Sequence, residues 1–226
     1  MNPIAIWMGV NAHIIVLAAG AVFAFIWLLL FRKRLQFSIV AAFILAVLHV
    51  VIGMMSVSIF AALENPNSYR LGMVSIFGGV FFMPIAYWAG AKLTKRDVKS
   101  VFDIFIICLL FTLMCSRFNC LSSGCCIGKV IPGLDGVRWP TRETEIIFYV
   151  VLMIIFSPKV LKGKSNGELY PIYMISYGIF RFVNETLRES SGTKIFHVSH
   201  LWALLCLCIG LSIFIEQQRT KKKKRK

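Results

Sequence analysis

Long apolar runs alternate with short polar segments along the whole chain. A helix needs about 20 predominantly apolar residues to cross the hydrocarbon core of a bilayer. The pattern therefore predicts an all-α, polytopic membrane protein with seven transmembrane helices. The predicted helices cover residues 9–31, 37–61, 72–91, 100–120, 145–161, 169–187 and 198–215. We expect residues 1–215 to form one membrane domain, followed by a basic cytoplasmic tail at 216–226.

The composition supports this interpretation. Apolar residues make up 58% of the chain and charged residues 15%, whereas soluble domains have about 45–50% and about 25%. The first run is too long for a cleavable signal peptide and lacks the basic residues that precede one, so we expect it to remain as an anchor. Together these observations exclude a soluble enzyme, a disordered chain and a small disulfide-rich domain.

Basic residues indicate how the helices are oriented. A net charge of +15 would suit nucleic-acid binding, but the basic residues punctuate the apolar runs and form no single soluble patch, so we expect no nucleic-acid partner. Of the 25 Lys and Arg residues, 17 lie in the loops 32–36, 92–99 and 157–168 and in the tail from Glu216. Because cytoplasmic loops are enriched in Lys and Arg, this count predicts an outside N-terminus and a cytoplasmic C-terminus.

The longest non-apolar stretch on the predicted outer side runs from Gly124 to Thr144. It contains four glycines and two prolines, which interrupt helices and mark turns. We therefore expect an ordered or re-entrant loop here and no further helix. Loops carry functional residues more often than packed helices do, which makes this loop a candidate part of a site.

A polar stripe runs along the 169–187 segment and just beyond it. Tyr177, Arg181, Glu185 and Arg188 are spaced by four, four and three residues, which places them within about 80° on one helix face. A charge inside a membrane span costs about 2.5–3.5 kcal/mol and persists where it faces protein or a watery cavity. The stripe predicts a polar cavity open to the outer side. The alternative is that Arg181 and Glu185 form an ion pair that only locks the bundle.

Two further features have two explanations each. Arg117 lies near the outer end of the 100–120 run, where it could extend to the headgroups or join the polar cavity. Gly78 and Gly79 in the third run allow either close packing between helices or close approach of the backbone to a ligand. The sequence alone leaves both choices open.

Three cysteines near Arg117 raise the question of a metal. Cys120, Cys125 and Cys126 suggest zinc, but the adjacent pair departs from the C-x₂-C spacing of structural zinc sites. We therefore expect no metal. A disulfide between Cys120 and one of the adjacent pair is an alternative on an oxidising side of the membrane.

Two arginines at headgroup depth indicate the ligand. Arg presents a planar fork of donors that binds phosphate with two hydrogen bonds, so Arg117 and Arg181 suggest a phospholipid phosphate. In a reaction they would stabilise charge on a departing phosphate, and Glu185 could orient them or act as a base. No cofactor motif is present in the sequence, so we expect no cofactor.

At these residues the sequence resembles the prolipoprotein diacylglyceryl transferase family. The resemblance runs from the first predicted helix to the seventh, and four segments occur in the order of the family. They are a Gly-Gly pair, an Arg signature with glycines seven and eleven residues later, a Pro-Thr-x-x-x-Glu segment and a Tyr-Gly-x-x-Arg-Phe-x-x-Glu-x-x-Arg segment. Their positions here are Gly78-Gly79; Arg117, Gly124 and Gly128; Pro140, Thr141 and Glu145; and Tyr177, Arg181, Glu185 and Arg188.

The family transfers the diacylglyceryl group of phosphatidylglycerol to a lipobox cysteine thiol and releases glycerol phosphate. The resemblance implies a multi-pass enzyme of the bacterial cytoplasmic (inner) membrane, with its cavity towards the outer leaflet and with phosphatidylglycerol and prolipoprotein as partners. It implies no metal, and it places Arg117, Arg181, Glu185 and Tyr177 in the reaction. The substrate-binding residues implied by position are His13, Gly78, Gly79, Cys120, Gly124, Cys125, Gly128, Glu145 and Arg188.

The sequence departs from the family pattern at several of these positions. A family His is Phe77 here, a family Asn is Cys120, a family Glu is Cys125, and the Tyr of the first span corresponds to His13. Two alternative functions therefore stay open. The first keeps the fold and the phospholipid donor but uses a different thiol, amine or hydroxyl acceptor. The second is a non-catalytic protein that binds or transports lipid.

Overall fold

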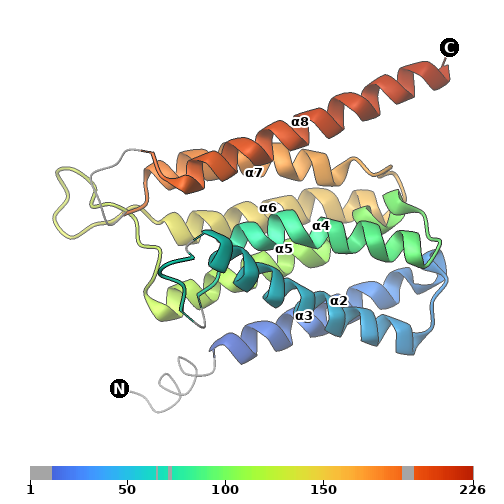
Figure 1. The fold of residues 1–226 in the computed structure, drawn as a ribbon, viewed down its shortest axis with the longest axis horizontal. Coiled ribbons are helices and arrows are strands. Elements are labelled where there is room, and N and C mark those ends of the chain that lie inside the picture. Colours follow the sequence, from blue (N-terminus) through green and yellow to red (C-terminus); the bar gives the residue numbers. More distant parts are fainter. Residues whose placement is uncertain (1–11, 65, 71–72, 190–195, 226) are drawn as a thin grey trace.

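The computed structural model describes residues 12–64, 66–70, 73–189 and 196–225 (Figure 1). Over these residues the protein is helical apart from loops and two isolated β-bridges. Each of the seven apolar runs forms a helix, which confirms the all-α prediction. The helices are α2 (Ala12–Leu35), α3 (Ile39–Glu64), α4 (Ile76–Leu93), α5 (Val98–Ser123), α6 (Thr141–Leu161), α7 (Leu169–Thr186) and α8 (Val198–Arg225).

Six of these helices are long and apolar enough to cross a membrane, and α7 is not among them. α7 has 18 residues, and its buried residues include Arg181, Asn184 and Glu185. These polar side chains make it less apolar than its neighbours. The structure therefore supports a helical, multi-pass membrane protein, and the seventh crossing stays a prediction.

α8 extends beyond the end of its apolar run. We expected the seventh helix to end at residue 215, but α8 continues to Arg225, because Lys, Arg, Gln and Glu favour helix. Its extension contacts the α6–α7 loop, where Gln217 Nε2 donates to the backbone oxygen of Gly167 at 3.0 Å and Lys221 forms an ion pair with Glu168. The predicted tail is thus a continuation of α8, which projects past the bundle in Figure 1.

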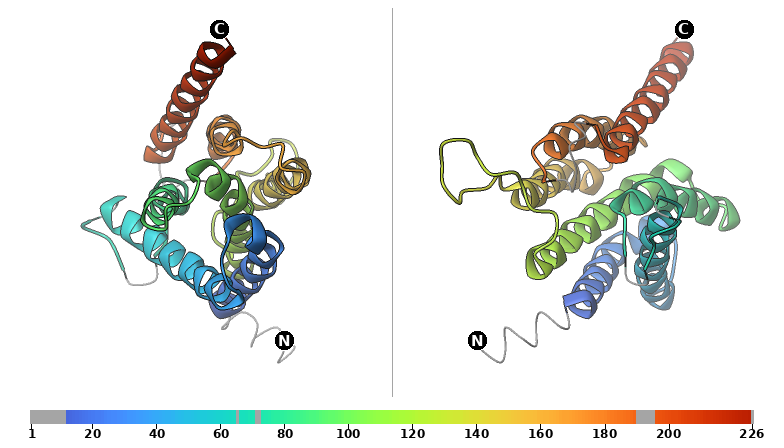
Figure 2. Two further views of the ribbon diagram at one scale, coloured as in Figure 1. Left: turned by 90° about the vertical axis from the view of Figure 1, so that its right-hand side faces the viewer. Right: turned by 60° about the vertical axis from the view of Figure 1, so that its left-hand side comes forward.

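α5 lies at the centre of the bundle. It packs against α2, α4, α6 and α7, and 61% of its most apolar segment is buried, compared with 22–44% in the other candidate spans. The left view of Figure 2 shows α2 and α3 on one side of the bundle and α7 and α8 on the other. This arrangement places the C-terminal half of α5 beside α6 and α7.

Glycines allow two helix pairs to approach closely. A Cβ at Gly178 of α7 would lie 2.7 Å from the backbone oxygen of Ala203 in α8, and a Cβ at Gly78 of α4 would lie 2.1 Å from that of Ser56 in α3. Both distances are shorter than a van der Waals contact, so only glycine fits without movement of the backbone. Of the two explanations for Gly78, close packing is the one that the structure shows, and a ligand contact stays a prediction.

The two ends of the bundle differ in charge. The connections 36–38, 94–97 and 162–168 all lie at one end, which we call the basic end, and the loop 124–140 lies at the opposite end (Figure 1). The three loops that are rich in Lys and Arg therefore lie on one side of the bundle, as the positive-inside rule requires. Which side faces the cytoplasm stays a prediction.

Candidate active site

Glu145 joins two buried arginines at the end of the bundle opposite the basic end. Its Oε1 lies 2.8 Å from Nη2 of Arg117 on α5, and its Oε2 lies 3.1 Å from Nη1 of Arg181 on α7. Tyr149, one turn later on α6, donates a hydrogen bond to Oε1 at 3.0 Å. The three charged side chains are at most 6% exposed. A single carboxylate from α6 therefore fixes the guanidinium groups of α5 and α7 relative to each other.

A second carboxylate extends the cluster along α7. Arg181 Nη2 lies 2.6 Å from Glu185 Oε2, and Arg188 Nη1 lies 3.6 Å from the same oxygen. We call Arg117, Glu145, Arg181, Glu185 and Arg188 the arginine cluster. Its three arginines and two carboxylates leave one positive charge, and Arg188, with 28% of its side chain exposed, connects it to the surface. This balance favours an anionic ligand.

Four buried donors of this region have no hydrogen-bond partner in the part of the chain that the structure describes. They are Nε of Arg117, Nε of Arg181 and the hydroxyls of Tyr177 and Tyr173. A buried polar group without a partner costs about 1–3 kcal/mol, and most such groups are paired. The arrangement therefore offers these donors to a ligand, while carboxylates contact both terminal nitrogens of Arg181 and one terminal nitrogen of Arg117.

Aromatic rings line the cluster on its inner side. The ring of Tyr177 stacks on that of Tyr173 with 5.6 Å between centroids, and it lies 6.3 Å from the ring of Tyr149. The guanidinium carbon of Arg181 lies 5.6 Å from the centroid of Phe77, within the range of a cation–π interaction. The residue before the Gly78-Gly79 pair thus contacts the cluster, although its side chain is apolar.

The loop after α5 contacts Arg188, the member of the cluster nearest the surface. Gly128 pairs with Arg188 in an antiparallel bridge, and a Cβ at Gly128 would lie 2.0 Å from the backbone oxygen of Trp139. The Sγ of Cys126 accepts a hydrogen bond from Arg188 Nη2 at 2.8 Å. The predicted loop is non-helical only as far as Pro140, because α6 begins at Thr141 and includes the last four residues expected in the loop. The loop fixes Arg188 through both its backbone and a thiol.

The cysteines lie directly beside Arg117. Its Nη1 is 3.7 Å from the Sγ of Cys120 and 3.9 Å from that of Cys126. Cys125 is exposed in the loop, and hydrogen bonds from the thiols of Cys120 and Cys126 lower the pKa of its thiol. All three are free thiols in this structure, which places an electron-rich group of sulfurs at the edge of the arginine cluster.

Most of the predicted site residues come together. Arg117 is buried and paired with a carboxylate, so it joins the site and does not extend to the headgroups. Gly128, Cys120 and Cys125 border the cluster. The predicted residues Arg117, Glu145, Arg181, Glu185 and Arg188 form the cluster, and the predicted Tyr177 lies beside it.

Other predicted residues lie elsewhere or have a packing role. Gly124 ends α5 in the left-handed conformation, with φ of 68°, as a helix C-cap does. A Cβ at Gly79 would lie 3.3 Å from the side chain of Leu113, which is a close helix contact. His13 belongs to α2, but its side chain is outside the described residues.

The sequence predicted Glu145 as a site residue but did not show that it is the shared partner of both arginines. Two further residues were missed. Tyr149, which donates a hydrogen bond to Glu145, was not among the predicted site residues. Its spacing of four residues from Glu145 indicates that the two share a helix face. Asn184 was missed too, and its Nδ2 donates to the backbone oxygen of Thr141 at 3.0 Å, which ties α7 to the start of α6.

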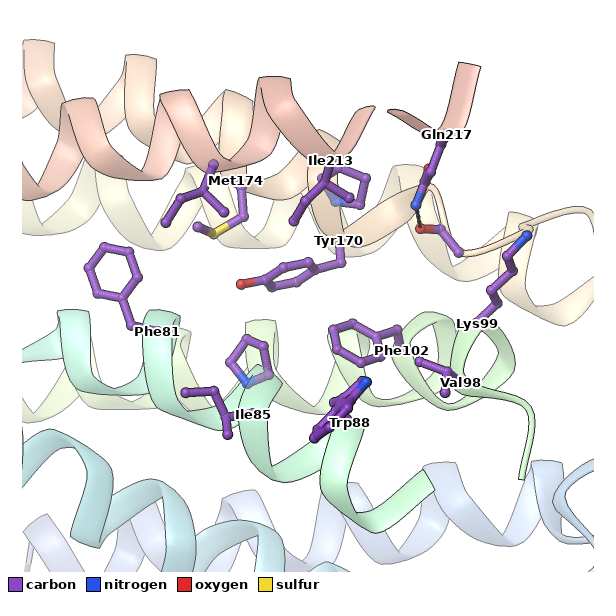
Figure 3. A pocket seen from close by; sticks show the side chains of 14 residues that line it. Phe81, Ile85, Trp88, Val98, Lys99, Phe102, Tyr170, Met174, Ile213 and Gln217 are labelled. Carbon is purple, nitrogen blue, oxygen red and sulfur yellow. Dashed lines mark hydrogen bonds between the residues drawn. The ribbon is translucent and has the colours of Figure 1, made fainter. Parts of the chain in front are cut away.

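A separate cavity of about 430 Å³ lies between α4–α5 and α7–α8, towards the basic end (Figure 3). Phe81, Ile85 and Trp88 line it from α4, and Tyr170 and Met174 line it from α7, with Lys99 and Gln217 at its end. Tyr170 is eleven residues before Arg181 on the same helix, about 16 Å along its axis. The lining is largely apolar, so the groups suited to chemistry are in the arginine cluster and not in this cavity.

Comparison with known proteins decides the family. The family model for prolipoprotein diacylglyceryl transferase matches residues 3–216. The chain belongs to the prolipoprotein diacylglyceryl transferase family. The match includes the whole arginine cluster and all of the described helices except the end of α8, which lies beyond residue 216.

Relatives at lower identity carry the corresponding name. A protein of Clostridium tetani is 23% identical over 62% of this chain and 62% of its own length. One of Dehalococcoides mccartyi is 23% identical over 70% of this chain and 67% of its own length, and one of Finegoldia magna is 27% identical over 66% and 64%. All three are named phosphatidylglycerol–prolipoprotein diacylglyceryl transferase. The chain thus spans about two thirds or less of the length of these relatives.

Proposed function

We propose that this protein transfers the diacylglyceryl group of phosphatidylglycerol to a cysteine thiol of a prolipoprotein and releases glycerol phosphate. The observation that carries the proposal is the pair of buried arginines held by Glu145, each with an unpartnered Nε. Each of these nitrogens, like the unpartnered hydroxyl of Tyr177, is a donor that a phosphate oxygen can accept from. The names of the relatives support the same donor and acceptor.

The chemistry follows from the charges. The acceptor sulfur forms a bond to the glyceryl carbon as that carbon's bond to the phosphate oxygen breaks, and the proton of the thiol passes to water. The departing glycerol phosphate gains a negative charge, which Arg117 and Arg181 stabilise because they are already oriented. Glu145 and Glu185 act as positioning residues, since each one lies against two arginines.

The test is incubation of the purified protein with labelled phosphatidylglycerol and a lipobox peptide. We expect the peptide to gain the mass of the diacylglyceryl group and glycerol phosphate to appear in equal amount. A peptide with Ser in place of Cys is the control and should stay unmodified. Release of glycerol phosphate without peptide modification would indicate a different acceptor, and lipid binding without release would indicate a protein that only binds or transports lipid.

We also propose that α7 crosses the membrane and that the N-terminus is outside and the C-terminus in the cytoplasm, with the arginine cluster at the outer leaflet of the inner membrane. The grouping of the basic loops supports this orientation. Reporter fusions at Lys95 and Lys164, both at the basic end, should be active only as cytoplasmic reporters. A periplasmic signal from either fusion would put the cluster at the wrong leaflet.

A further inference from the structure

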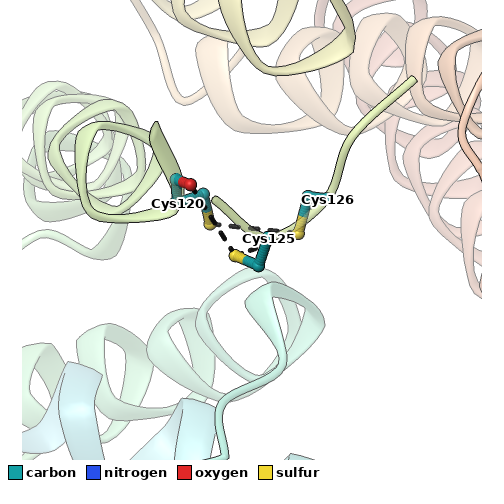
Figure 4. A group of neighbouring side chains, drawn as sticks. All are labelled: Cys120, Cys125 and Cys126. Atoms are coloured by element: carbon teal, nitrogen blue, oxygen red, sulfur yellow. Dashed lines mark hydrogen bonds between the residues drawn. The ribbon is translucent and has the colours of Figure 1, made fainter. Parts of the chain in front are cut away.

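Three cysteine sulfurs meet beside the arginine cluster, from two segments of the chain. Cys120 lies near the end of α5, and Cys125 and Cys126 lie in the loop that follows (Figure 4). The chain turns back between them because Gly124 and Cys126 have φ of 68° and 59°. The Sγ of Cys126 is 4.0 Å from that of Cys120 and 3.6 Å from that of Cys125, and all three sulfurs lie within 4.8 Å of one another.

The two separations of 3.6 and 4.0 Å are close to those of sulfurs that bind one ion, and the third pair would have to lie at a similar distance in the bound state. A metal bound at about 2.3 Å from each sulfur, in a trigonal or tetrahedral arrangement, separates the sulfurs by about 3.8–4.0 Å. A disulfide requires about 2.05 Å, roughly half of the observed distances. The adjacent Cys125-Cys126 pair does not have the spacing of a structural zinc motif, but the turn at Gly124 supplies Cys120 as the third ligand.

Two arginines lie beside two of the three sulfurs. Arg117 Nη1 lies 3.7 Å from the Sγ of Cys120, and Arg188 Nη2 lies 2.8 Å from the Sγ of Cys126. Thiolate ligands select soft ions such as Cu(I) and Zn(II), and the exposed Cys125 gives such an ion access.

We propose that Cys120, Cys125 and Cys126 bind one soft, thiophilic metal ion through three thiolates. This site is separate from the proposed transfer reaction. The ion would tie the end of α5 to the loop that holds Arg188, and so it would act as a positioning site next to the arginine cluster. The sequence led us to expect no metal, both from the cysteine spacing and from the family resemblance, and that expectation is untested. The arrangement of the three sulfurs is what favours the present proposal over it.

The test is metal titration of the full-length protein in detergent, reduced and free of metal. Cu(I) and Zn(II) are added in separate anaerobic titrations against a competing chelator, and X-ray absorption reports the ligands. We expect one ion per protein with three sulfur ligands at about 2.2–2.3 Å. Ser replacements at Cys120, Cys125 or Cys126 should weaken binding by more than about 100-fold, since loss of an outer partner alone costs about 10–100-fold.

Cys208→Ser is the matched control, because Cys208 is also exposed but lies on α8. It should bind metal as the unchanged protein does. Melting temperature, recorded with and without the ion, shows whether each variant folds, and Cys125→Ser is the variant least expected to disturb folding. Binding to neither ion, or binding that survives all three replacements, overturns the proposal, as does a disulfide among the three that leaves no metal uptake after reduction. Activity of the transferase does not enter this test, so the two proposals fail independently.

Discussion

Two buried polar networks in this bundle use their hydrogen bonds differently. In the first, the two ring nitrogens of His49 on α3 lie 3.1 Å from the hydroxyl of Tyr87 on α4 and 3.1 Å from that of Thr112 on α5. Thr112 in turn donates to the backbone oxygen of Cys108 at 2.8 Å. We call these three side chains the His49 network. Each of its polar atoms has a partner inside the bundle.

The arginine cluster is also buried and joins three helices, but some hydrogen-bond donors in it and beside it have no partner. Arg117 Nε, Arg181 Nε and the Tyr177 hydroxyl have no partner among the described residues, and one positive charge is left over. A satisfied network holds helices together, whereas a cluster with spare donors and spare charge is built for a ligand. Buried atoms outside the cluster, such as Nε2 of His200 and Nε1 of Trp202, also lack a partner among the described residues. The comparison therefore teaches that neither burial nor a spare donor alone marks a site, and that the cluster differs in combining spare donors with spare charge.

Replacement of Glu145 should give the largest effect. Glu145→Ala removes the carboxylate shared by Arg117 and Arg181, and a buried pair that loses one partner typically costs about 3–5 kcal/mol. We expect a large fall in melting temperature in detergent and no measurable turnover. Glu143→Ala is the control, because Glu143 is 44% exposed and lies 3.7 Å from Arg142, and it should change the stability by less than about 0.5 kcal/mol. Equal stability of the two variants would contradict the central role of Glu145.

Arg181→Lys should reduce turnover of phosphatidylglycerol by about 10²–10³-fold. Arg181 contacts Glu145 and Glu185 through two nitrogens and has a third, Nε, for a phosphate. Lys keeps the charge but has only one nitrogen for all three contacts. The variant should insert and fold. Arg138→Lys, at an exposed arginine paired with Glu189, should stay near the unchanged rate. Near-normal turnover of Arg181→Lys would leave Arg181 as an ion-pair partner that only locks the bundle.

Tyr177→Phe separates ligand binding from stability. It removes a buried hydroxyl that has no partner among the described residues, so the melting temperature should not fall. If that hydroxyl binds a phosphate oxygen, its loss costs about 1.5–3 kcal/mol of transition-state binding, or about tenfold or more in turnover. Unchanged turnover with unchanged stability would remove Tyr177 from the reaction.

Tyr87→Phe should give the opposite result and the smallest effect. It removes the hydrogen bond between Tyr87 and His49, which typically contributes about 0.5–1.5 kcal/mol. We expect a modest fall in melting temperature and unchanged turnover per folded molecule. A loss of turnover without a loss of stability would show that the His49 network also serves the reaction.

Sequence patterns predicted the elements and much of the site. The seven apolar runs became the seven described helices, because the length of an apolar run is a local property. The stripe of Tyr177, Arg181 and Glu185 on α7 was equally predictable, since the helix repeat fixes which residues share a face. The extension of α8 to Arg225 was missed because its polar residues carry no membrane signal, although they favour helix.

The sequence by itself determined the class of protein and the approximate positions of its helices, and it predicted most of the residues that form the arginine cluster. Only the tertiary structure decided that Glu145 of α6 is the common partner of Arg117 and Arg181, and that Cys120 meets Cys125 and Cys126. It also decided that Gly78 packs against α3. The physical reason is that spacing along a helix fixes neighbours one turn apart, whereas contacts between helices depend on which faces pack together, and that is set by the whole bundle.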